Sequence, residues 1–361
     1  MKYTNSAQEA GHIVFVHPSL MGGGAERVSL ALASYFVSHG IRFTYFLTKS
    51  NVIEYDVPDG VEVCSEFADA SLKPLDQVKL IRRFVSERPK ATVISFLPHQ
   101  NMYTLMATIG LPNRVIVSVR NDPRYDFPGN KILPFIRNML YRRSDAIVFQ
   151  TKSQASLMPR YLQTNSKIIL NPISSELPEP YSGLRRKAIV TAGRLELQKN
   201  HSMTIRSFEL FHKKHPEYIL EIFGKGSLQS ELENLVHSLD MDDSIKFMGF
   251  SSDALLHIRT ASAFVMSSKF EGLSNSMLES LCMGVPTICT KCGGGGAEAV
   301  IRNGVNGILV DIDDDIAESE ALNKIVEDKS YSNHLSNNAL MLRRSLSLET
   351  IGNEWANLLF K

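Results

Sequence analysis

The chain has 361 residues, of which 43% are hydrophobic and 21% are charged. This is the composition of an ordinary globular protein, so disordered and fibrous classes are excluded, and the length exceeds what one compact core usually covers. The net charge of +1 hides an asymmetry, because residues 1–176 hold 20 Lys and Arg against 14 Asp and Glu, and the remainder holds 19 against 24.

Cysteine usage and hydropathy predict a reduced cytoplasmic protein. The four cysteines form no CxxC pair and have no histidine-rich neighbour, so no zinc site is expected. No stretch approaches the ~20 apolar residues of a membrane-spanning helix, so any membrane contact would be peripheral. Residues 79–143 hold 12 basic and 3 acidic side chains. They form either a solvated face or a surface that attracts membrane lipid or a phosphorylated acceptor.

Strand and helix patterns alternate along the N-terminal half. Residues 12–16 predict a buried strand, 26–39 a helix and 41–47 the next strand, with three glycines in the first turn. Further strands are expected at 92–97, 115–119 and 146–150, with helical patterns between them. The alternation predicts a parallel sheet covered by helices.

A segment rich in proline and glycine, residues 173–187, is predicted as a linker between two domains. Strands are expected beyond it at 188–192, 218–223, 245–248, 262–266 and 286–289, with helices at 201–214, 228–238, 252–260 and 275–283. The sequence thus predicts an α/β protein with two Rossmann-like, doubly wound domains, 1–172 and 188–343, facing each other across a cleft. Residues 344–361 are expected to form a C-terminal helix that crosses back to the N-terminal domain.

Ligands of doubly wound sheets bind beyond the carboxyl ends of strands, so the loops there are the candidates for a site. Residues 22–27 read Gly-Gly-Gly-Ala-Glu-Arg, and such glycines let backbone amides approach an anion. Residues 192–201 supply Arg194 and Lys199, a planar fork and a point charge suited to a diphosphate. The alternatives are a tight turn for the first loop and two unremarkable surface cations for the second.

The third loop, residues 267–274, leads into a helix that starts at Asn275 with Ser274 as its N-cap. Amides near 273–276 can receive phosphate oxygens. Glu271 before the helix and Glu279 inside it can accept hydrogen bonds from sugar hydroxyls. In the alternative, Glu271 complements the helix dipole and Glu279 faces solvent.

Together these segments resemble the family-four retaining glycosyltransferases of the GT-B fold, especially enzymes of bacterial surface-polysaccharide and lipid-linked-oligosaccharide assembly. Glu271 and Glu279 have the spacing of the family's E-x7-E motif, residues 193–200 resemble its phosphate loop, and residues 22–27 resemble its GGAER loop. The three motifs stand in the family's order.

The resemblance implies that Arg194 and Lys199 bind the donor diphosphate, that Glu271 contacts the donor sugar and that Glu279 holds the ribose. Arg120 stands where many relatives carry a histidine, and it is expected to bind phosphate or sugar instead. These implied catalytic residues are Arg194, Lys199, Glu271 and Arg120. The remaining implied donor-binding residues are Gly23, Gly24, Gly193, Gly249, Phe250, Gly272, Leu273, Ser274 and Asn275. The acceptor-binding candidates are Gly22, Glu26, Arg27 and His99.

The expected reaction is retaining transfer of a hexose or N-acetylhexosamine from a nucleotide sugar to a glycan acceptor. A UDP sugar is the first expectation, with GDP-mannose open, and the acceptor is expected to be lipid-diphosphate-linked. No metal or cofactor is expected, because cations neutralise the diphosphate, and the acidic run 311–315 is expected to be a solvated turn. The expected localisation is the cytoplasm, either free or bound peripherally to the cytoplasmic face of the inner membrane.

Two other functions fit the same architecture. A nucleotide-sugar epimerase would use the donor without an acceptor, and a non-catalytic protein would only bind the nucleotide sugar. Nucleic acid is not expected as a partner, because the basic residues lack interleaved aromatic side chains.

Overall fold

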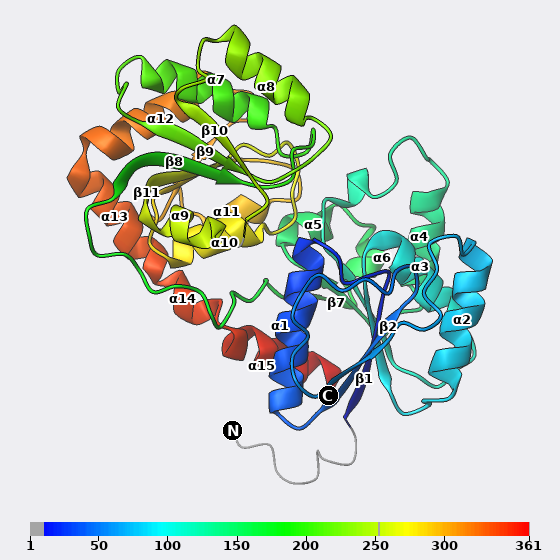
Figure 1. Cartoon of the computed structure of the whole chain (residues 1–361). Helices are drawn as coiled ribbons and strands as arrows, with labels where there is room; N and C mark the ends of the chain where they lie inside the picture. Colours follow the sequence, from blue (N-terminus) through cyan, green and yellow to red (C-terminus); the bar gives the residue numbers. More distant parts are fainter. Residues whose placement is uncertain (1–10, 252, 361) are drawn as a thin grey trace. The chain divides into compact units, whose positions relative to one another are not determined.

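The computed structural model describes residues 11–251 and 253–360, and the chain divides into two compact units (Figure 1). The N-terminal unit comprises Met1–Pro172 with Leu348–Lys361, and the C-terminal unit comprises Ile173–Ser347. Each unit is a parallel sheet covered by helices, as the alternating pattern predicts.

The N-terminal unit holds a seven-stranded parallel sheet in the order β3-β2-β1-β4-β5-β6-β7. Its strands are β1 (His12–His17), β2 (Arg42–Leu47), β3 (Val61–Cys64), β4 (Thr92–Phe96), β5 (Val115–Val119), β6 (Ala146–Phe149) and β7 (Ser166–Ile168). Its helices are α1 (Gly24–Ser38), α2 (Pro74–Ser86), α3 (Pro98–Ala107), the 3₁₀ turn η2 (Pro123–Tyr125), α4 (Leu133–Tyr141), α5 (Lys152–Ser156), α6 (Arg160–Gln163) and α15 (Leu348–Leu359).

Sequence patterns predicted the five central strands and missed the edge strands β3 and β7. The central strands are buried on both faces and read as apolar runs, whereas β3 and β7 are short and only partly buried. The last helix, α15, packs on α1, where the Tyr35 ring leaves no room for a side chain at Gly352. Trp355 on α15 is fully buried in the same core.

The C-terminal unit holds a six-stranded parallel sheet in the order β10-β9-β8-β11-β12-β13. Its strands are β8 (Arg186–Ala192), β9 (Ile219–Phe223), β10 (Ile245–Gly249), β11 (Ala261–Met266), β12 (Thr287–Thr290) and β13 (Ile308–Val310). Its helices are α7 (His201–His212), α8 (Gln229–Ser238), α9 (Ala254–Thr260), α10 (Asn275–Cys282), α11 (Gly296–Val300), α12 (Asp315–Glu327), α13 (Lys329–Leu340) and α14 (Leu342–Ser345). The first five strands and the first four helices lie where the sequence predicts them, within two residues at each end.

The segment predicted as a linker is bound to the C-terminal unit. The amide of Ile173 donates to the carbonyl of Leu346 at 2.9 Å. The guanidinium of Arg185 donates to the carbonyls of Arg259, Ala261 and Gly284 at 3.0, 3.1 and 2.6 Å. Residues 173–185 therefore form an irregular strap along this unit, and β8 begins two residues earlier than expected.

A buried carboxyl group on α12, Glu318, lies directly beneath the end of β11. One oxygen is 2.5 Å from the Ser207 hydroxyl, and the other accepts from Ser267 at 2.6 Å. The Ser207 hydroxyl has a single hydrogen, and the carbonyl of Thr204 lies 3.0 Å away to accept it. Both contacts of Ser207 are satisfied if Glu318 is protonated and donates to Ser207. In agreement, burial raises the pKa of Glu318 to about 7.

The raised pKa of Glu318 predicts a pH dependence of stability. The folded chain holds this proton more tightly than the unfolded chain does. The protonated group therefore makes its full contribution to the free energy of unfolding below pH 4.5, and this contribution is lost as the pH rises towards 7. The loss lowers the free energy of unfolding by about 3 kcal/mol. Glu318→Gln should therefore raise the free energy of unfolding at pH 8 and leave it nearly unchanged at pH 4.5, as measured by urea unfolding. Exposed Glu298→Gln is the control. Equal pH dependence in Glu318→Gln and the unmodified chain would contradict the protonated state.

Candidate active site

The two C-terminal loops singled out in the sequence meet at one edge of the sheet. They follow β8 and β11, which are neighbours in the sheet. The amide of Lys269 donates to the carbonyl of Gln198 at 2.8 Å, and the amide of Glu271 donates to the carbonyl of Gly293 at 2.8 Å. The structure thus brings the predicted phosphate loop against the segment that carries Glu271.

Lys199 and Glu271 form an ion pair with a distance of 2.5 Å between Nζ and Oε2. Both side chains are only 14% exposed, so water screens the pair weakly. Gln198 donates to the carbonyl of Phe270 at 3.0 Å and lies 3.3 Å from Arg194, which is exposed. An exposed cation and a largely buried ion pair therefore lie side by side at the loop. The pairing of Glu271 with Lys199 replaces the alternative in which Glu271 only complements a helix dipole.

Glycines let the loops after β8 and β9 pack backbone against backbone. A Cβ on Gly224 would lie 1.9 Å from the carbonyl oxygen of Gly193, and one on Gly226 would lie 2.3 Å from that of Leu195. His201 begins α7 beneath this loop, and burial, helped by the charge of Lys199, lowers its pKa to about 4. The predicted phosphate loop therefore rests on a neutral imidazole.

Helix α10 starts at Asn275, as predicted, but Ser274 does not cap it with its side chain. The Ser274 hydroxyl lies 3.1 Å from the hydroxyl of Ser276, which donates to the carbonyl of Ala192 at 3.2 Å. The expected side-chain cap is wrong, because this contact turns the hydroxyl away from the helix amides. The N-terminus of α10 is instead tied to the end of β8.

Glu279 is 4% exposed, which rules out the alternative in which it faces solvent. It lies in the second turn of α10 among buried Leu278 and Ser280. At the other end of the loop, Gly272 packs so closely on α11 that a Cβ at Gly296 would lie 1.7 Å from the Gly272 carbonyl oxygen. The segment between the two glutamates is therefore held in place from both sides.

The acidic run 311–315 is a turn whose carboxylates pair with cations. Asp311 lies 2.7 Å from Lys291, Asp315 lies 2.5 Å from Arg206, and Asp314 caps α12. Asp313 accepts from Asn200 at 2.9 Å, next to Lys199. The remaining predicted donor residues of this unit lie at the end of β10, where the half-buried Gly249 has a positive φ of 68° and Phe250 is exposed.

In the N-terminal unit, the glycine loop 22–24 leads from β1 into α1. A Cβ on Gly23 would lie 2.0 Å from a carboxylate oxygen of Glu26, so a side chain there would require the Glu26 carboxylate to move. Glu26 is buried in the first turn of α1, and Tyr55 donates to the carbonyl of Gly23 at 3.2 Å. His17 at the end of β1 lies 3.9 Å from Glu26, and burial lowers its pKa to about 4. The structure therefore adds a neutral histidine that motif spacing did not reveal.

Arg120 follows β5 and is held by uncharged groups. Its guanidinium donates to Asn171 at 2.6 Å, contacts the Ser118 hydroxyl at 3.4 Å and lies 4.4 Å from the centre of the Phe96 ring. Its Nε has no partner among the described residues, and burial lowers the pKa of this guanidinium to about 9. A partly buried cation that pairs with no carboxylate among the described residues is costly unless an anion binds to it.

His99 lies at the start of α3, after β4, and its ring contacts Phe127 edge-on at 4.9 Å. It is exposed, and partial desolvation with the charge of Lys49 lowers its pKa. Because β1, β4 and β5 are neighbours in the sheet, the structure places the glycine loop, His99 and Arg120 at one edge of the N-terminal unit. Asn171 and Gln150, which donates to Asn171 at 2.7 Å, complete the surroundings of Arg120 and carry no motif in the sequence.

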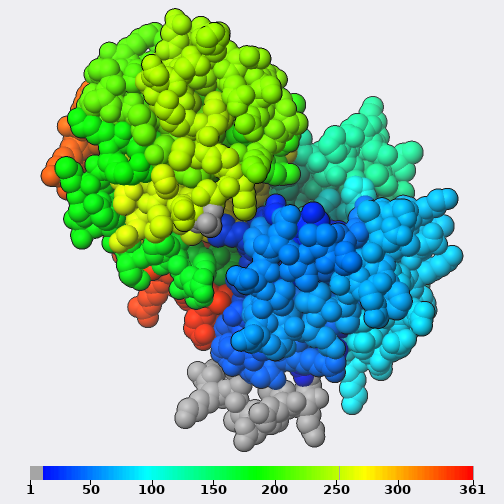
Figure 2. Space-filling model, in the orientation of Figure 1, coloured from blue at the N-terminus to red at the C-terminus, as the bar shows by residue number. Residues whose placement is uncertain are grey.

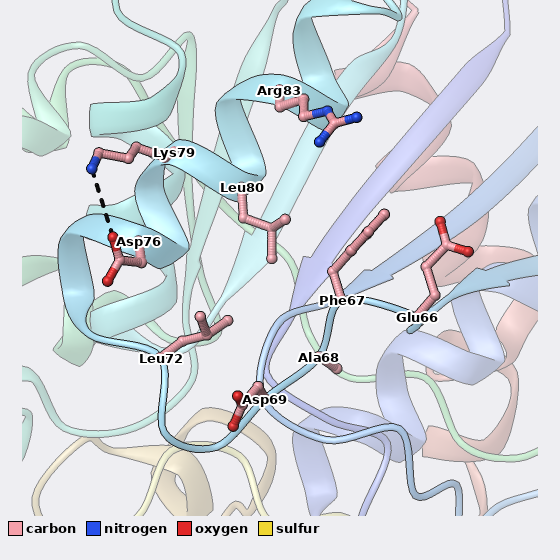
Figure 3. A pocket seen from close by; sticks show the side chains of 9 residues that line it. All are labelled: Glu66, Phe67, Ala68, Asp69, Leu72, Asp76, Lys79, Leu80 and Arg83. Atoms are coloured by element: carbon pink, nitrogen blue, oxygen red, sulfur yellow. Dashed lines mark ion pairs between the residues drawn. The ribbon is translucent and has the colours of Figure 1, made fainter.

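A separate pocket of about 650 Å³ lies at the outer edge of the same sheet (Figure 3). It is formed by residues 66–69 after β3 and by α2, and Leu72 and Leu80 turn towards it (Figure 3). Asp76 and Lys79 pair at 3.7 Å beside it. It contains none of the residues predicted from the motifs.

Comparisons with known proteins show that the chain is similar to glycosyltransferases. Residues 179–341 match the model of the family described as glycosyl transferases group 1. The chain is 28% identical over 356 residues, 96% of its length and 98% of the relative, to a Campylobacter jejuni subsp. jejuni serotype O:2 enzyme. This relative is named GalNAc-α-(1→4)-GalNAc-α-(1→3)-diNAcBac-PP-undecaprenol α-1,4-N-acetyl-D-galactosaminyltransferase. A second transferase of that organism, a diphospho-undecaprenol 4-α-N-acetylgalactosaminyltransferase, is 25% identical and covers 89% of the chain and 92% of the relative.

The solved structures agree on the fold. Anabaena HepE in complex with UDP and glucose superposes with a TM-score of 0.83 at 17% identity, covering 97% of this chain and 99% of that one. The chain therefore has the GT-B fold, and its residues 179–341 match the glycosyl transferases group 1 family, in agreement with the resemblance inferred from its motifs. Among residues 11–251 and 253–360, no helix has the length and apolar character needed to cross a membrane.

Proposed function

We propose that the chain is a retaining glycosyltransferase that moves a hexose or N-acetylhexosamine from a UDP sugar to a lipid-diphosphate-linked glycan in bacterial surface-glycan assembly. The observation that carries the proposal is the Lys199–Glu271 ion pair beside Arg194, which supplies cations for a diphosphate and a carboxylate for a sugar. Two of its relatives are named for diphospho-undecaprenol-linked or PP-undecaprenol-linked acceptors, and HepE was crystallised with UDP and glucose.

In this proposal the donor lies on the C-terminal unit. Arg194 and Lys199 stabilise the negative charge that grows on the leaving diphosphate, together with amides at the start of α10. Glu271 accepts hydrogen bonds from the sugar, and Glu279 from the ribose. No metal is required, because side-chain cations balance the diphosphate. The proposal also assigns the 272–275 segment to the donor, together with Gly193, Gly249, Phe250, Gly23 and Gly24.

Retention follows if the acceptor attacks the face that the diphosphate leaves. The bond from the anomeric carbon to the phosphate oxygen breaks, and the bond to the acceptor oxygen forms on the same side. The acceptor proton passes to the departing phosphate oxygen, so no protein base is needed. Glu271 is paired with Lys199, which leaves it poorly suited to act as a nucleophile.

The acceptor is assigned to the N-terminal unit. Gly22, Glu26, Arg27 and His99 are the proposed contacts, and Arg120 is proposed to bind a phosphate or sugar. Peripheral contact with an anionic membrane belongs to the same proposal, since the acceptor is a lipid. An epimerase receives no support from the comparisons. An assay of product formation distinguishes a transferase from a non-catalytic binder, because only a transferase forms a product when donor and acceptor are both present.

The donor is tested by thermal denaturation with a panel of nucleotide sugars, because a ligand that binds the folded chain raises Tm. UDP-hexoses and UDP-N-acetylhexosamines should raise Tm, and GDP-mannose should not.

The anomeric configuration of the product, read by NMR, then tests retention. A product of inverted configuration, or stabilisation by GDP-mannose alone, would overturn the corresponding part of the proposal.

Glu279→Gln should weaken nucleotide-sugar binding by roughly tenfold, because a neutral amide binds ribose hydroxyls less strongly than a carboxylate does. Isothermal titration with the donor identified above measures the change. Glu298→Gln, an exposed position on α11, is the matched control and should bind normally. An unchanged dissociation constant for Glu279→Gln would remove Glu279 from the ribose site.

A further inference from the structure

Helix α4 in the N-terminal unit carries large apolar side chains on its outer face and a buried arginine on its inner face. Arg137 points inwards and is 4% exposed, whereas Ile132, Phe135 and Met139 are 68, 66 and 56% exposed. Together with Ile136, which is 37% exposed, these residues recur at i, i+3, i+4 and i+7, so they form one continuous ridge along the helix. We call these four residues the α4 ridge.

The inward arginine is satisfied within the unit. Arg137 forms an ion pair with Asp126 at 2.5 Å and donates to the carbonyl of Pro123 at 2.9 Å. The side chain of Asn130 accepts from the amides of Ile132 and Leu133 at 2.9 Å, which fixes the start of the helix. These polar contacts and the packing of Tyr141 and Leu140 in the core therefore set the orientation of α4. The outward ridge contributes little to folding and needs another explanation.

The ends of the α4 ridge carry positive charge. Lys131 precedes it, and Arg142 and Arg143 follow it, and all three are exposed. Arg142 lies 5.4 Å from the ring of Tyr161, which is 51% exposed. Residues 127–175 contain seven Lys and Arg and a single acidic residue, Asp145. Other basic residues of 79–143 are engaged elsewhere, such as Arg82, which donates to the carbonyls of Ala107 and Ile109.

We infer that the α4 ridge is a membrane-docking surface, which enters the interface of an anionic bilayer while Lys131, Arg142 and Arg143 bind lipid phosphates. An apolar ridge between cations is the pattern of an interfacial helix, whose apolar side chains enter the headgroup boundary. Tyr161 is suited to the same boundary. In the space-filling view, the segment that carries α4 forms part of the outer surface of the N-terminal unit (Figure 2).

A second copy of the chain fits this surface less well. In a symmetric dimer the same patch meets itself, so Lys131, Arg142 and Arg143 of one copy would face those of the other. Like charges across an interface are unfavourable, whereas anionic lipid complements all of them. The inference concerns the partner of the N-terminal unit and does not depend on the identity of the sugar.

Phe135→Trp tests insertion directly. Trp355 is the only tryptophan of the chain and is fully buried, so a spectral change on adding lipid reports on position 135. Vesicles of equal parts phosphatidylglycerol and phosphatidylcholine should shift the emission to the blue, and brominated lipid should quench it. Ile316→Trp, at a position 65% exposed on α12, should show neither effect. An unshifted, unquenched spectrum for Phe135→Trp would overturn insertion.

Sedimentation with the same vesicles separates the ridge from the charges. Ile132→Ser/Phe135→Ser should lower the partition coefficient by roughly tenfold or more. Arg142→Gln/Arg143→Gln should lower it about fivefold for each charge at low salt. The matched controls are Leu256→Ser/Ile316→Ser, at positions 52 and 65% exposed, and Lys213→Gln/Lys214→Gln, directly after α7. These controls should bind as the unmodified chain does.

Three outcomes would overturn the inference. They are equal binding to pure phosphatidylcholine, controls that lose as much binding as the α4 variants, and a lipid-free dimer that Phe135→Ser dissociates in sedimentation velocity. Because 132 and 135 are exposed, Tm should be unchanged in the variants. Nucleotide-sugar affinity measured without lipid should also be unchanged, so failure of the docking surface and failure of the donor site are distinguishable.

Discussion

Lys199→Ala and Arg194→Ala are each expected to lower kcat/KM by a hundredfold or more. Both cations are assigned to the leaving diphosphate, and loss of one preorganised electrostatic contact of this kind costs ~2–4 kcal/mol of transition-state stabilisation. Steady-state kinetics with the donor and acceptor measures the effect. Exposed Lys213→Ala is the control and should turn over normally.

The ion pair of Lys199 adds a second, structural effect that must be separated from the first. Lys199→Ala leaves the carboxylate of Glu271, which is only 14% exposed, without its cation, so Tm should fall. Lys199→Ala/Glu271→Gln should regain Tm but not activity. Arg194 is exposed, so Arg194→Ala should lose activity without losing stability. Near-normal turnover of both single variants would contradict the diphosphate assignment.

Arg120→Met is expected to reduce transfer by about a hundredfold while leaving Tm unchanged or higher. The loss of rate follows if the guanidinium holds a phosphate or sugar, since such a contact is worth ~2–4 kcal/mol in a protected site. Stability should not suffer, because the substitution removes a desolvated charge that lacks an anionic partner. Asn171 keeps the hydrogen bond from Gln150. Kinetics and thermal denaturation on the same samples test both parts.

Arg120→Lys is the companion variant, because it keeps the charge and loses the planar fork. Partial activity in Arg120→Lys would show that the charge matters beyond the shape of the fork. A structural role predicts the opposite pattern for Arg120→Met, namely a lower Tm with activity that falls only as far as the folded fraction. That result would remove Arg120 from the catalytic residues.

The sequence was sufficient for the fold because its central strands are buried on both faces and read as apolar runs. The C-terminal loops were equally readable, since Gly193, Lys199 and Glu271 stand at a spacing that one family uses. Contacts across the sheet could not be predicted from the sequence, because they join residues far apart in the chain. The pairing of Lys199 with Glu271 is one such contact.

The N-terminal unit shows the same limit more strongly. Nothing in the local pattern marks Asn171 as the partner of Arg120, or His17 as the neighbour of Glu26, because each pair joins the ends of different elements. The helical periodicity of α4 was readable, but its orientation was not. That orientation depends on the buried pair of Arg137 and Asp126, which no spacing rule predicts.

Helix α15 sets an order for folding during synthesis. Residues 348–359 supply Trp355 to the core of the N-terminal unit, yet the ribosome makes them only after the whole of Ile173–Ser347. The C-terminal unit can therefore complete its folding while the N-terminal unit still exposes the face of α1 that α15 later covers. Domains usually fold in the order in which they are made. Here the unit begun first is the unit completed last, and the environment of Trp355 reports when that happens.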